Sequence, residues 1–149
     1  MRIVRTCLVV ALAFVVAGCS CRARKVGGPD DGNIPVAAAD GVLKDVNFGF
    51  DRYDLDATAK GLLAKNAEWL NANTSHKVQI EGHCDERGTN EYNMVLGANR
   101  ARAAHDYLRS LGVDASRMST VSYGEELPLD PSKTEEAYAK NRRAHFNVQ

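Results

Sequence analysis

Two oppositely charged residues, Asp85 and Arg100, lie within residues 82–102, a segment rich in polar side chains. Asp85 falls in a polar stretch just before Gly88, and Arg100 falls in a helical pattern that follows. A site with one free carboxylate and one free guanidinium would suit a zwitterion, because each charge of the ligand meets its opposite. Asp85 or Glu86 could instead form an internal salt bridge with Arg100. The residues alone favour that second interpretation.

Helical spacing places Arg100 on the apolar side of its helix. Apolar residues recur there at steps of three and four: Tyr92, Leu96, Ala103, Ala104, Tyr107 and Leu111. Arg100 lies on the same line, four residues after Leu96 and four before Ala104. A buried guanidinium is costly unless it meets an anion or extends to water. The spacing therefore predicts an anionic partner for Arg100.

Alternating strand and helix patterns from Gly41 onward indicate how these charges are positioned. The expected elements are a strand at 42–50, a helix at 57–72, a strand at 77–81, a loop at 83–89, a helix at 91–111, a strand at 118–123, a connection at 124–131, a short helix at 134–141 and a strand at 143–148. Thr89 can cap the longest helix, and Gly112 ends it. This β-α-β-α-β-(α)-β order predicts an α/β sandwich, a sheet with helices packed on one face.

The first 40 residues differ in character from the rest. Arg2 and Arg5 precede an apolar run at 8–17, which is too short to cross a hydrocarbon core of ~30 Å, so residues 1–18 resemble an export signal. The sequence Val-Ala-Gly-Cys that ends at Cys19 resembles the bacterial lipobox, in which the cysteine is lipidated; an ordinary cleavage site before an incidental cysteine is the alternative. Residues 19–40 are expected to form a flexible tether, and residues 41–149 one domain.

Charge and cysteine content exclude several classes of protein. The 149 residues contain 19 basic and 19 acidic side chains, and without residues 1–18 the balance is 17 to 19, a net charge of −2, which argues against a nucleic-acid partner. Only Cys21 and Cys84 would remain beside a lipidated Cys19, so no disulfide framework is expected. No CxxC or HxxxH spacing occurs, and neither a metal site nor another cofactor is expected.

One long motif links the charged segment to a known family. Residues 82–103 contain the pattern GHxDERGTxEYNxxLGxxRA, and together with residues 46–51 and 141–144 they resemble the OmpA-like peptidoglycan-binding domain. The resemblance covers roughly residues 42–149 and implies a mixed four-stranded sheet. Cys84 stands where relatives usually carry Ala or Thr, and Asn99 stands where close relatives carry Arg. Cys84 is expected to be an inert small hydrophobe rather than an oxidisable thiol, and an auxiliary carboxylate contact at position 99 is in doubt.

The family resemblance also implies a ligand and the residues that bind it. The family binds the free end of meso-diaminopimelate in peptidoglycan, so Asp85 would take its ammonium group and Arg100 its carboxylate. Phe50 and Asp51 would supply backbone N–H groups, and Leu96 would line the pocket. Arg142 or Arg143 would support the site, and the sequence does not distinguish them; a simple surface charge is the alternative for either.

The same resemblance implies a place in the cell and further partners. Ser20, not Asp, follows the predicted lipidated cysteine, which implies the periplasmic face of a bacterial outer membrane. Lipid-anchored members of the family tether that membrane to the cell wall and also bind TolB and TolA, so a protein-docking module is an alternative main role. An enzyme is not expected, because His83, Cys84, Asp85 and Glu86 carry no nucleophile signature. Paired carboxylates for wall-glycan hydrolysis are a remote alternative.

Overall fold

The computed structural model describes residues 42–149, and the predicted export signal (1–18) and tether (19–40) lie outside the described residues. The elements are, in chain order, β1 (Val46–Asn47), α1 (Ala57–Ala72), β2 (Val78–His83), α2 (Asn90–Ser110), the 3₁₀ helix η1 (Ala115–Arg117), β3 (Met118–Gly124), α3 (Glu135–Asn141) and β4 (Arg143–Val148). Among the described residues, no helix is long and apolar enough to cross a membrane.

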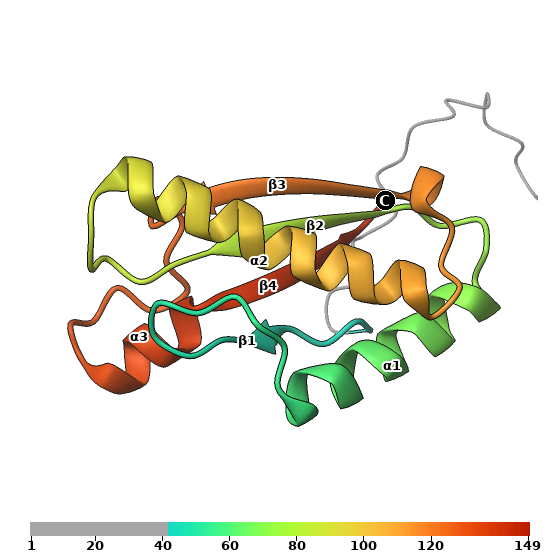
Figure 1. Cartoon of the computed structure of the whole chain (residues 1–149), viewed down its shortest axis with the longest axis horizontal. Helices are drawn as coiled ribbons and strands as arrows, with labels where there is room; N and C mark the ends of the chain where they lie inside the picture. Colours follow the sequence, from blue (N-terminus) through green and yellow to red (C-terminus); the bar gives the residue numbers. More distant parts are fainter. Residues whose placement is uncertain (1–41) are drawn as a thin grey trace, which may run out of the picture. The chain divides into compact units, whose positions relative to one another are not determined.

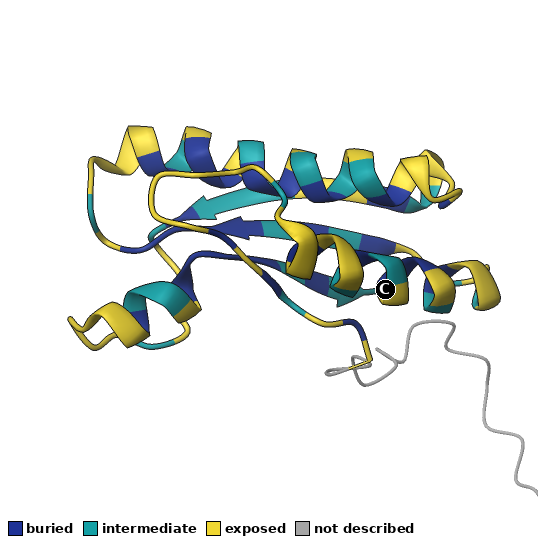
Figure 2. Ribbon diagram, turned by 60° about the horizontal axis from the view of Figure 1, so that its bottom comes forward, coloured by how far each residue is buried: buried dark blue, intermediate teal, exposed yellow. Residues whose placement is uncertain are grey.

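The four strands form one mixed sheet in the order β1-β4-β2-β3 (Figure 1). Strand β4 is antiparallel to both β1 and β2, whereas β2 and β3 run parallel and are joined through α2. Helices α1 and α2 pack against the sheet with their buried sides turned toward it (Figure 2). Helix α3 lies at the end of the sheet where β4 begins. The predicted mixed four-stranded sheet with helices packed on one face is therefore confirmed.

Two glycines bring α2 into direct contact with the sheet. A Cβ atom on Gly82 of β2 would lie 1.9 Å from the carbonyl oxygen of Gly97, and a Cβ on Gly97 would lie 2.4 Å from Oγ of Ser122. A side chain at either position would clash. Because both residues are glycines, the backbone of α2 can lie directly against β2 and β3 at Gly97. The contact lies between Leu96 and Arg100 in the sequence and so fixes where those side chains enter the structure.

The first strand is much shorter than the predicted range of 42–50. Only Val46 and Asn47 pair with β4, and one further bond joins the Phe48 N–H to the carbonyl of Arg142 at 2.9 Å. The chain then turns, with the Arg52 N–H bonded to the Gly49 carbonyl at 3.3 Å and Asp51 at a φ of 55°. The alternating pattern that predicted a longer strand therefore ends at Phe48, and Phe50 is 57% exposed.

Helix α2 buries a somewhat different stripe from the one expected. Its buried residues are Asn93, Leu96, Gly97, Arg100, Ala101, Ala104 and Leu108. The expected inward residues Tyr92 and Leu111 are 52% and 37% exposed. A helix has 3.6 residues per turn, so residues spaced four apart drift around its axis, and the two ends of such a row turn away from the buried face. The Thr89 hydroxyl accepts from the Tyr92 N–H at 3.2 Å, as its predicted capping role requires. Gly112, at a φ of 91°, follows the end of the helix.

Candidate functional site

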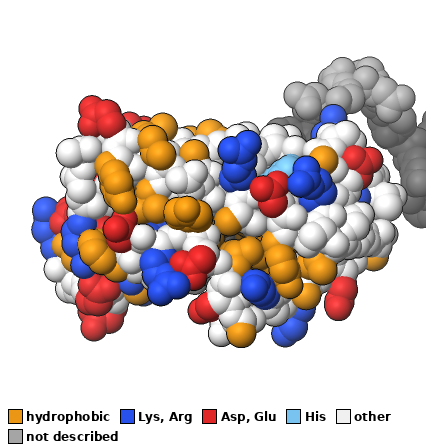
Figure 3. Space-filling view, in the orientation of Figure 1, with side chains coloured by type: hydrophobic (Ala, Val, Ile, Leu, Met, Phe, Trp, Pro, Cys, Tyr) orange, Lys and Arg blue, Asp and Glu red, His pale blue; other side chains and the backbone are white. Residues whose placement is uncertain are grey.

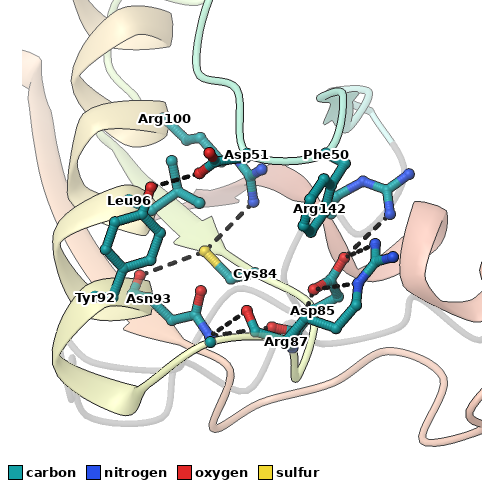
Figure 4. Close-up of a pocket in the computed structure, with 11 residues that line it drawn as sticks. Phe50, Asp51, Cys84, Asp85, Arg87, Tyr92, Asn93, Leu96, Arg100 and Arg142 are labelled. Atoms are coloured by element: carbon teal, nitrogen blue, oxygen red, sulfur yellow. Dashed lines mark hydrogen bonds and ion pairs between the residues drawn. The ribbon is translucent and has the colours of Figure 1, made fainter.

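The five predicted binding residues, Asp85, Arg100, Phe50, Asp51 and Leu96, line one pocket with a volume of about 220 Å³ (Figure 4). Its walls come from four places in the chain. The turn after β1 brings Phe50 and Asp51, the loop after β2 brings Asp85, α2 brings Leu96 and Arg100, and the segment after α3 brings Arg142. The sheet order brings two of these segments together. Arg142 directly precedes β4 and the loop with Asp85 directly follows β2, and β4 and β2 are adjacent strands.

Arg100 is completely buried and meets only neutral acceptors. Its Nε donates to the Arg52 carbonyl at 2.9 Å, and its Nη2 donates to the Gly49 carbonyl at 3.2 Å. Nη1 donates to the His83 carbonyl at 2.8 Å and to the Cys84 sulfur at 3.3 Å. Among the described residues Arg100 forms no ion pair, and burial lowers the pKa of its guanidinium. The internal salt bridge between Asp85 or Glu86 and Arg100, which the residues alone favoured, is absent from this part of the chain.

The contacts of Arg100 also shape the turn that follows β1. The two carbonyls it holds, those of Gly49 and Arg52, flank Phe50 and Asp51. Asp51 adopts a left-handed backbone conformation, which aspartate tolerates better than most residues. Within residues 42–149, no hydrogen bond uses the backbone N–H of Phe50 or Asp51. The turn is therefore held by its carbonyls and leaves two N–H donors without an acceptor among residues 42–149.

Asp85 is almost fully buried, at 4% exposed, and is paired with two other arginines. Arg87 donates to its carboxylate through Nε at 3.2 Å and Nη2 at 2.6 Å, and Arg142 donates through Nη1 at 3.1 Å. Burial acts to raise the pKa of Asp85, but the hydrogen bonds from Arg87 and Arg142 outweigh it, and the pKa lies below its ordinary value. Asp85 is therefore a buried, ionised carboxylate.

The structure distinguishes Arg142 from Arg143. The guanidinium of Arg142 reaches the pocket, where it also donates to the Phe48 carbonyl at 3.1 Å and pairs with Glu135 at 3.0 Å. Arg143 begins β4 and lies by Asp45, with its Nε 3.4 Å from that carboxylate, in a separate pocket. Of the two candidates, Arg142 is the one that lines this pocket.

Arg87 was not predicted from the sequence as a site residue. Its guanidinium lies 4.2 Å from the ring centre of Phe50 and 4.6 Å from that of Tyr138. It also pairs with Glu135 at 3.2 Å. The only sequence signal was its place in the DERG segment, because helical or strand spacing carries no information about a loop residue.

Two residues of α2 that were not predicted as site residues, Asn93 and Tyr92, also line the pocket. Asn93 is buried and its Nδ2 donates to the carbonyls of Asp85 and Arg87, each at 3.3 Å, and to the Glu125 carboxylate. Tyr92 lies at the rim, where its hydroxyl donates to Asp51. Asn93 thus holds the loop after β2, and Tyr92 holds the turn after β1. Asn99, whose auxiliary contact was in doubt, is not among the lining residues.

The chemical groups beside Asp85 do not form a nucleophilic pair. Burial raises the pKa of the Cys84 thiol to about 11, so the thiol stays protonated, and its sulfur donates to the Asn93 carbonyl at 3.3 Å. His83 lines the other pocket, with Arg143, and is stacked on Tyr123. Within the described part of the chain, no group of three or more His, Cys, Asp or Glu side chains is arranged to hold a metal ion.

Comparison with known proteins agrees with the fold and the motif. The model of the OmpA family matches residues 47–142. The peptidoglycan-associated lipoprotein of Haemophilus influenzae is 42% identical over 147 residues, which cover 96% of each chain. The protein of that name from Mesorhizobium japonicum is 44% identical and covers 92% of this chain and 86% of its own.

Solved structures give the same result. The crystal structure of the peptidoglycan-associated lipoprotein from Burkholderia pseudomallei superposes with a TM-score of 0.69 at 39% identity, covering 71% of this chain and 90% of that one. The C-terminal domain of Helicobacter pylori MotB, at 20% identity and a TM-score of 0.68, shares the fold. The family resemblance carried by residues 82–103 is confirmed. The chain belongs to the OmpA family and, within it, to the group of peptidoglycan-associated lipoproteins.

Proposed function

We propose that this protein is a lipoprotein of the bacterial outer membrane that binds the meso-diaminopimelate of peptidoglycan without covalent attachment and so ties the membrane to the cell wall. The names of its relatives support an association with peptidoglycan. One observation carries the choice of ligand: Arg100 is a fully buried cation at the pocket, and its protein partners are all neutral.

Arg100 and the turn after β1 together form the carboxylate half of the site. A ligand carboxylate beside Arg100 would form the direct ion pair that none of the described residues forms with it. The free N–H groups of Phe50 and Asp51 add two donors for the same anion. Leu96 lines the same pocket and packs against the aliphatic part of the ligand.

Asp85 forms the ammonium half of the site. Its carboxylate is ionised and lines the pocket, and in Figure 4 it approaches from a different side than Arg100. A zwitterionic amino-acid end fits between the two, whereas a simple amine or a simple carboxylate satisfies only one of them. This arrangement supports recognition of diaminopimelate over a stem peptide that ends in lysine.

Sedimentation with intact sacculi tests the site. We expect the parent chain to co-sediment and the Asp85→Ala and Arg100→Ala variants to remain in solution, because each leaves one ligand charge unpaired at a cost of ~2–5 kcal/mol. Arg102→Ala, an exposed arginine on the same helix, and Glu86→Ala, the exposed neighbour of Asp85, are matched controls that should still sediment. Circular dichroism shows that each variant is folded. Co-sedimentation of both folded site variants at the level of the parent would refute the site.

The membrane attachment rests on residues outside the described structure. Cleavage after Gly18 would leave Cys19 as the lipidated first residue, and residues 19–40 would serve as the tether. Acyl chains contribute ~0.8 kcal/mol per buried CH₂, so several chains together hold a protein firmly in a membrane. Labelled palmitate should be incorporated by the parent and not by Cys19→Ala, and continued labelling of the variant would refute the assignment.

A role in a Tol-Pal system of envelope integrity and cell division follows from the same family. A docking surface for a TolB-like protein overlapping the pocket is supported by two lining aromatic residues, Phe50 and Tyr92, which are 57% and 52% exposed. A TolA-type protein is the second expected partner. If Asp85→Ala loses sacculi but retains purified TolB in a pull-down, the two surfaces are separable and protein docking is an independent role.

The surroundings of the pocket favour binding without catalysis. The Cys84 thiol has a raised pKa, and the Glu86 carboxylate is paired with Lys133 at 3.0 Å and accepts from the Tyr138 hydroxyl at 2.9 Å, so neither is positioned as a catalytic partner of Asp85. On the face shown in Figure 3, acidic and basic side chains of the described residues are interspersed, unlike the basic surface of a nucleic-acid-binding protein. Release of soluble muropeptides from sacculi by the purified protein would show instead that it is a hydrolase.

A further inference from the structure

The carboxylate of Asp85 already receives four hydrogen bonds from the protein. Oδ1 accepts from the backbone N–H of Arg87 at 3.1 Å and from its Nε at 3.2 Å. Oδ2 accepts from Nη2 of Arg87 at 2.6 Å and from Nη1 of Arg142 at 3.1 Å. An ionised carboxylate has about four acceptor positions, and all of them are used. A ligand ammonium group can therefore bind Asp85 only if one of these donors leaves.

Of the two guanidinium groups on Asp85, that of Arg87 is the one free to leave. The side chain of Arg142 is 9% exposed and is also held by the Phe48 carbonyl and by Glu135. The side chain of Arg87 is 35% exposed, and it already contacts an alternative anion, because its Nη1 lies 3.2 Å from Glu135, which is 62% exposed.

The rings on either side of Arg87 offer it a path between the two anions. Its guanidinium lies against Phe50 at 4.2 Å and against Tyr138 at 4.6 Å, and both rings attract a cation on their faces. Figure 4 shows Arg87 and Phe50 at the same side of the pocket as Asp85. A small rotation of the side chain would exchange Asp85 for Glu135 without returning the cation to bulk water.

We propose that Arg87 is a built-in cation that occupies the ammonium position on Asp85 in the free protein, and that the ligand's ammonium group displaces it toward Glu135. The inference rests on the proposed function and deepens it, because it assigns Arg87 a role in selectivity. A ligand with an ammonium group alone would exchange one cation for another at Asp85 and gain little. Only a ligand whose carboxylate also reaches Arg100 gains enough to displace Arg87.

Calorimetry on the full chain in detergent, with the synthetic tripeptide L-alanyl-γ-D-glutamyl-meso-diaminopimelate, tests this role. In Arg87→Gln the competing charge is removed, so we expect binding about three- to tenfold tighter than in the parent. With the same tripeptide acetylated on its free side-chain amine, parent and variant should bind equally and weakly. Lys133→Gln removes an equal charge that pairs with Glu86 instead of Asp85, and it should leave the affinity unchanged.

A spectroscopic measurement separates displacement from a general effect of charge. The ¹H–¹⁵N signal of the Arg87 Nε–H group should shift when the tripeptide binds to the parent, because its bond to Asp85 is broken, and the acetylated tripeptide should leave it in place. Unchanged or weaker binding of the tripeptide by folded Arg87→Gln overturns the inference and leaves the proposed function intact. Failure of the parent itself to bind the tripeptide overturns the proposed function, and this inference with it.

Discussion

Arg100 and Asp85 bring opposite charges to one pocket but meet different kinds of partner. The carbonyls of Gly49, Arg52 and His83 accept hydrogen bonds from Arg100 without neutralising its charge. Asp85 is neutralised by guanidinium groups. We therefore expect the site to bind an anion at Arg100. At Asp85 we expect a ligand ammonium group to replace a guanidinium that is already bound.

Arg100→Lys separates the charge of this residue from its geometry. A lysine ammonium keeps the charge but cannot reach the three carbonyls that the planar guanidinium holds, so buried acceptors are left without donors. We expect a loss of about 2–4 kcal/mol in the free energy of unfolding and weaker binding to sacculi. Urea unfolding measures the first, with Arg102→Lys as an exposed control within ~0.5 kcal/mol of the parent. A variant as stable as the parent would show that these contacts do not hold the turn.

At the scale of elements, the position of the site depends on the contact between α2 and the sheet. The backbone of α2 at Gly97 rests on β2 at Gly82, and the next turn of the helix carries Arg100. Loops from β1 and β2 then close around that side chain. Packing of glycine against glycine leaves no flexible atom to absorb a change.

Gly82→Ala should therefore be strongly destabilising. The new Cβ would lie 1.9 Å from the Gly97 carbonyl oxygen, so α2 must move, at a cost of ~3 kcal/mol or more in the free energy of unfolding. Gly61→Ala in α1 is the matched control, because a Cβ there meets nothing within 4 Å. It should stabilise the protein by ~0.4–1 kcal/mol. Thermal unfolding distinguishes these opposite signs, and a neutral Gly82→Ala would contradict the close approach.

His83, in β2, should make the free energy of unfolding depend on pH. Burial, with help from the positive charges of Arg143 and His145, lowers the pKa of His83 to about 4. As the pH falls below ~6.5 the unfolded chain binds a proton at His83 before the folded protein does, so stability is full above ~6.5 and is lost between there and about 4. His145 has the opposite sign, because its hydrogen bond with Asp45 raises its pKa and favours folding at low pH.

His83→Gln should flatten this dependence. We expect the stability lost between pH 6.5 and pH 4 to be smaller than in the parent by about 1–2 kcal/mol. Urea unfolding at three pH values, compared as slopes and not as absolute stabilities, removes the cost of the substitution itself. Identical slopes in parent and variant would show that His83 is not the responsible group.

The whole molecule is proposed to bind at both ends. Lipid at Cys19 would hold the membrane, and the pocket around Asp85 and Arg100 would hold the wall. The tether between them, residues 19–40, would span up to roughly 65 Å when fully stretched. Neither end alone links the two layers of the envelope.

A vesicle assay tests this two-ended role. Vesicles carrying the lipidated parent chain should sediment with sacculi. Vesicles prepared with Cys19→Ala should not, because the variant stays off the membrane, although the variant itself should still bind sacculi. Vesicles carrying lipidated Asp85→Ala should also stay in solution, because this variant stays on the membrane but does not bind sacculi. Sedimentation of vesicles with either variant at the level of the parent would contradict the model.

The sequence by itself determined the order of the elements, the capping role of Thr89, the inward position of Arg100 and five of the residues that line the pocket. These features depend on local spacing or on one long motif, and both can be recognised in the sequence alone. The early end of β1 could not be predicted from the sequence, because the Gly49 carbonyl accepts a hydrogen bond from Arg100, which is 51 residues away along the chain.

Only the tertiary structure decided which charges meet. Asp85 had Arg87, Arg100 and Arg142 as possible partners, and each long side chain can reach several acceptors from one backbone position. Arg142, 57 residues away in sequence, reaches Asp85 because the sheet sets the start of β4 beside β2. Arg100 is held instead by carbonyls of the turn after β1. A salt bridge that the residues alone favoured is thus replaced by an unneutralised buried cation, because strand order, not spacing along the chain, sets these distances.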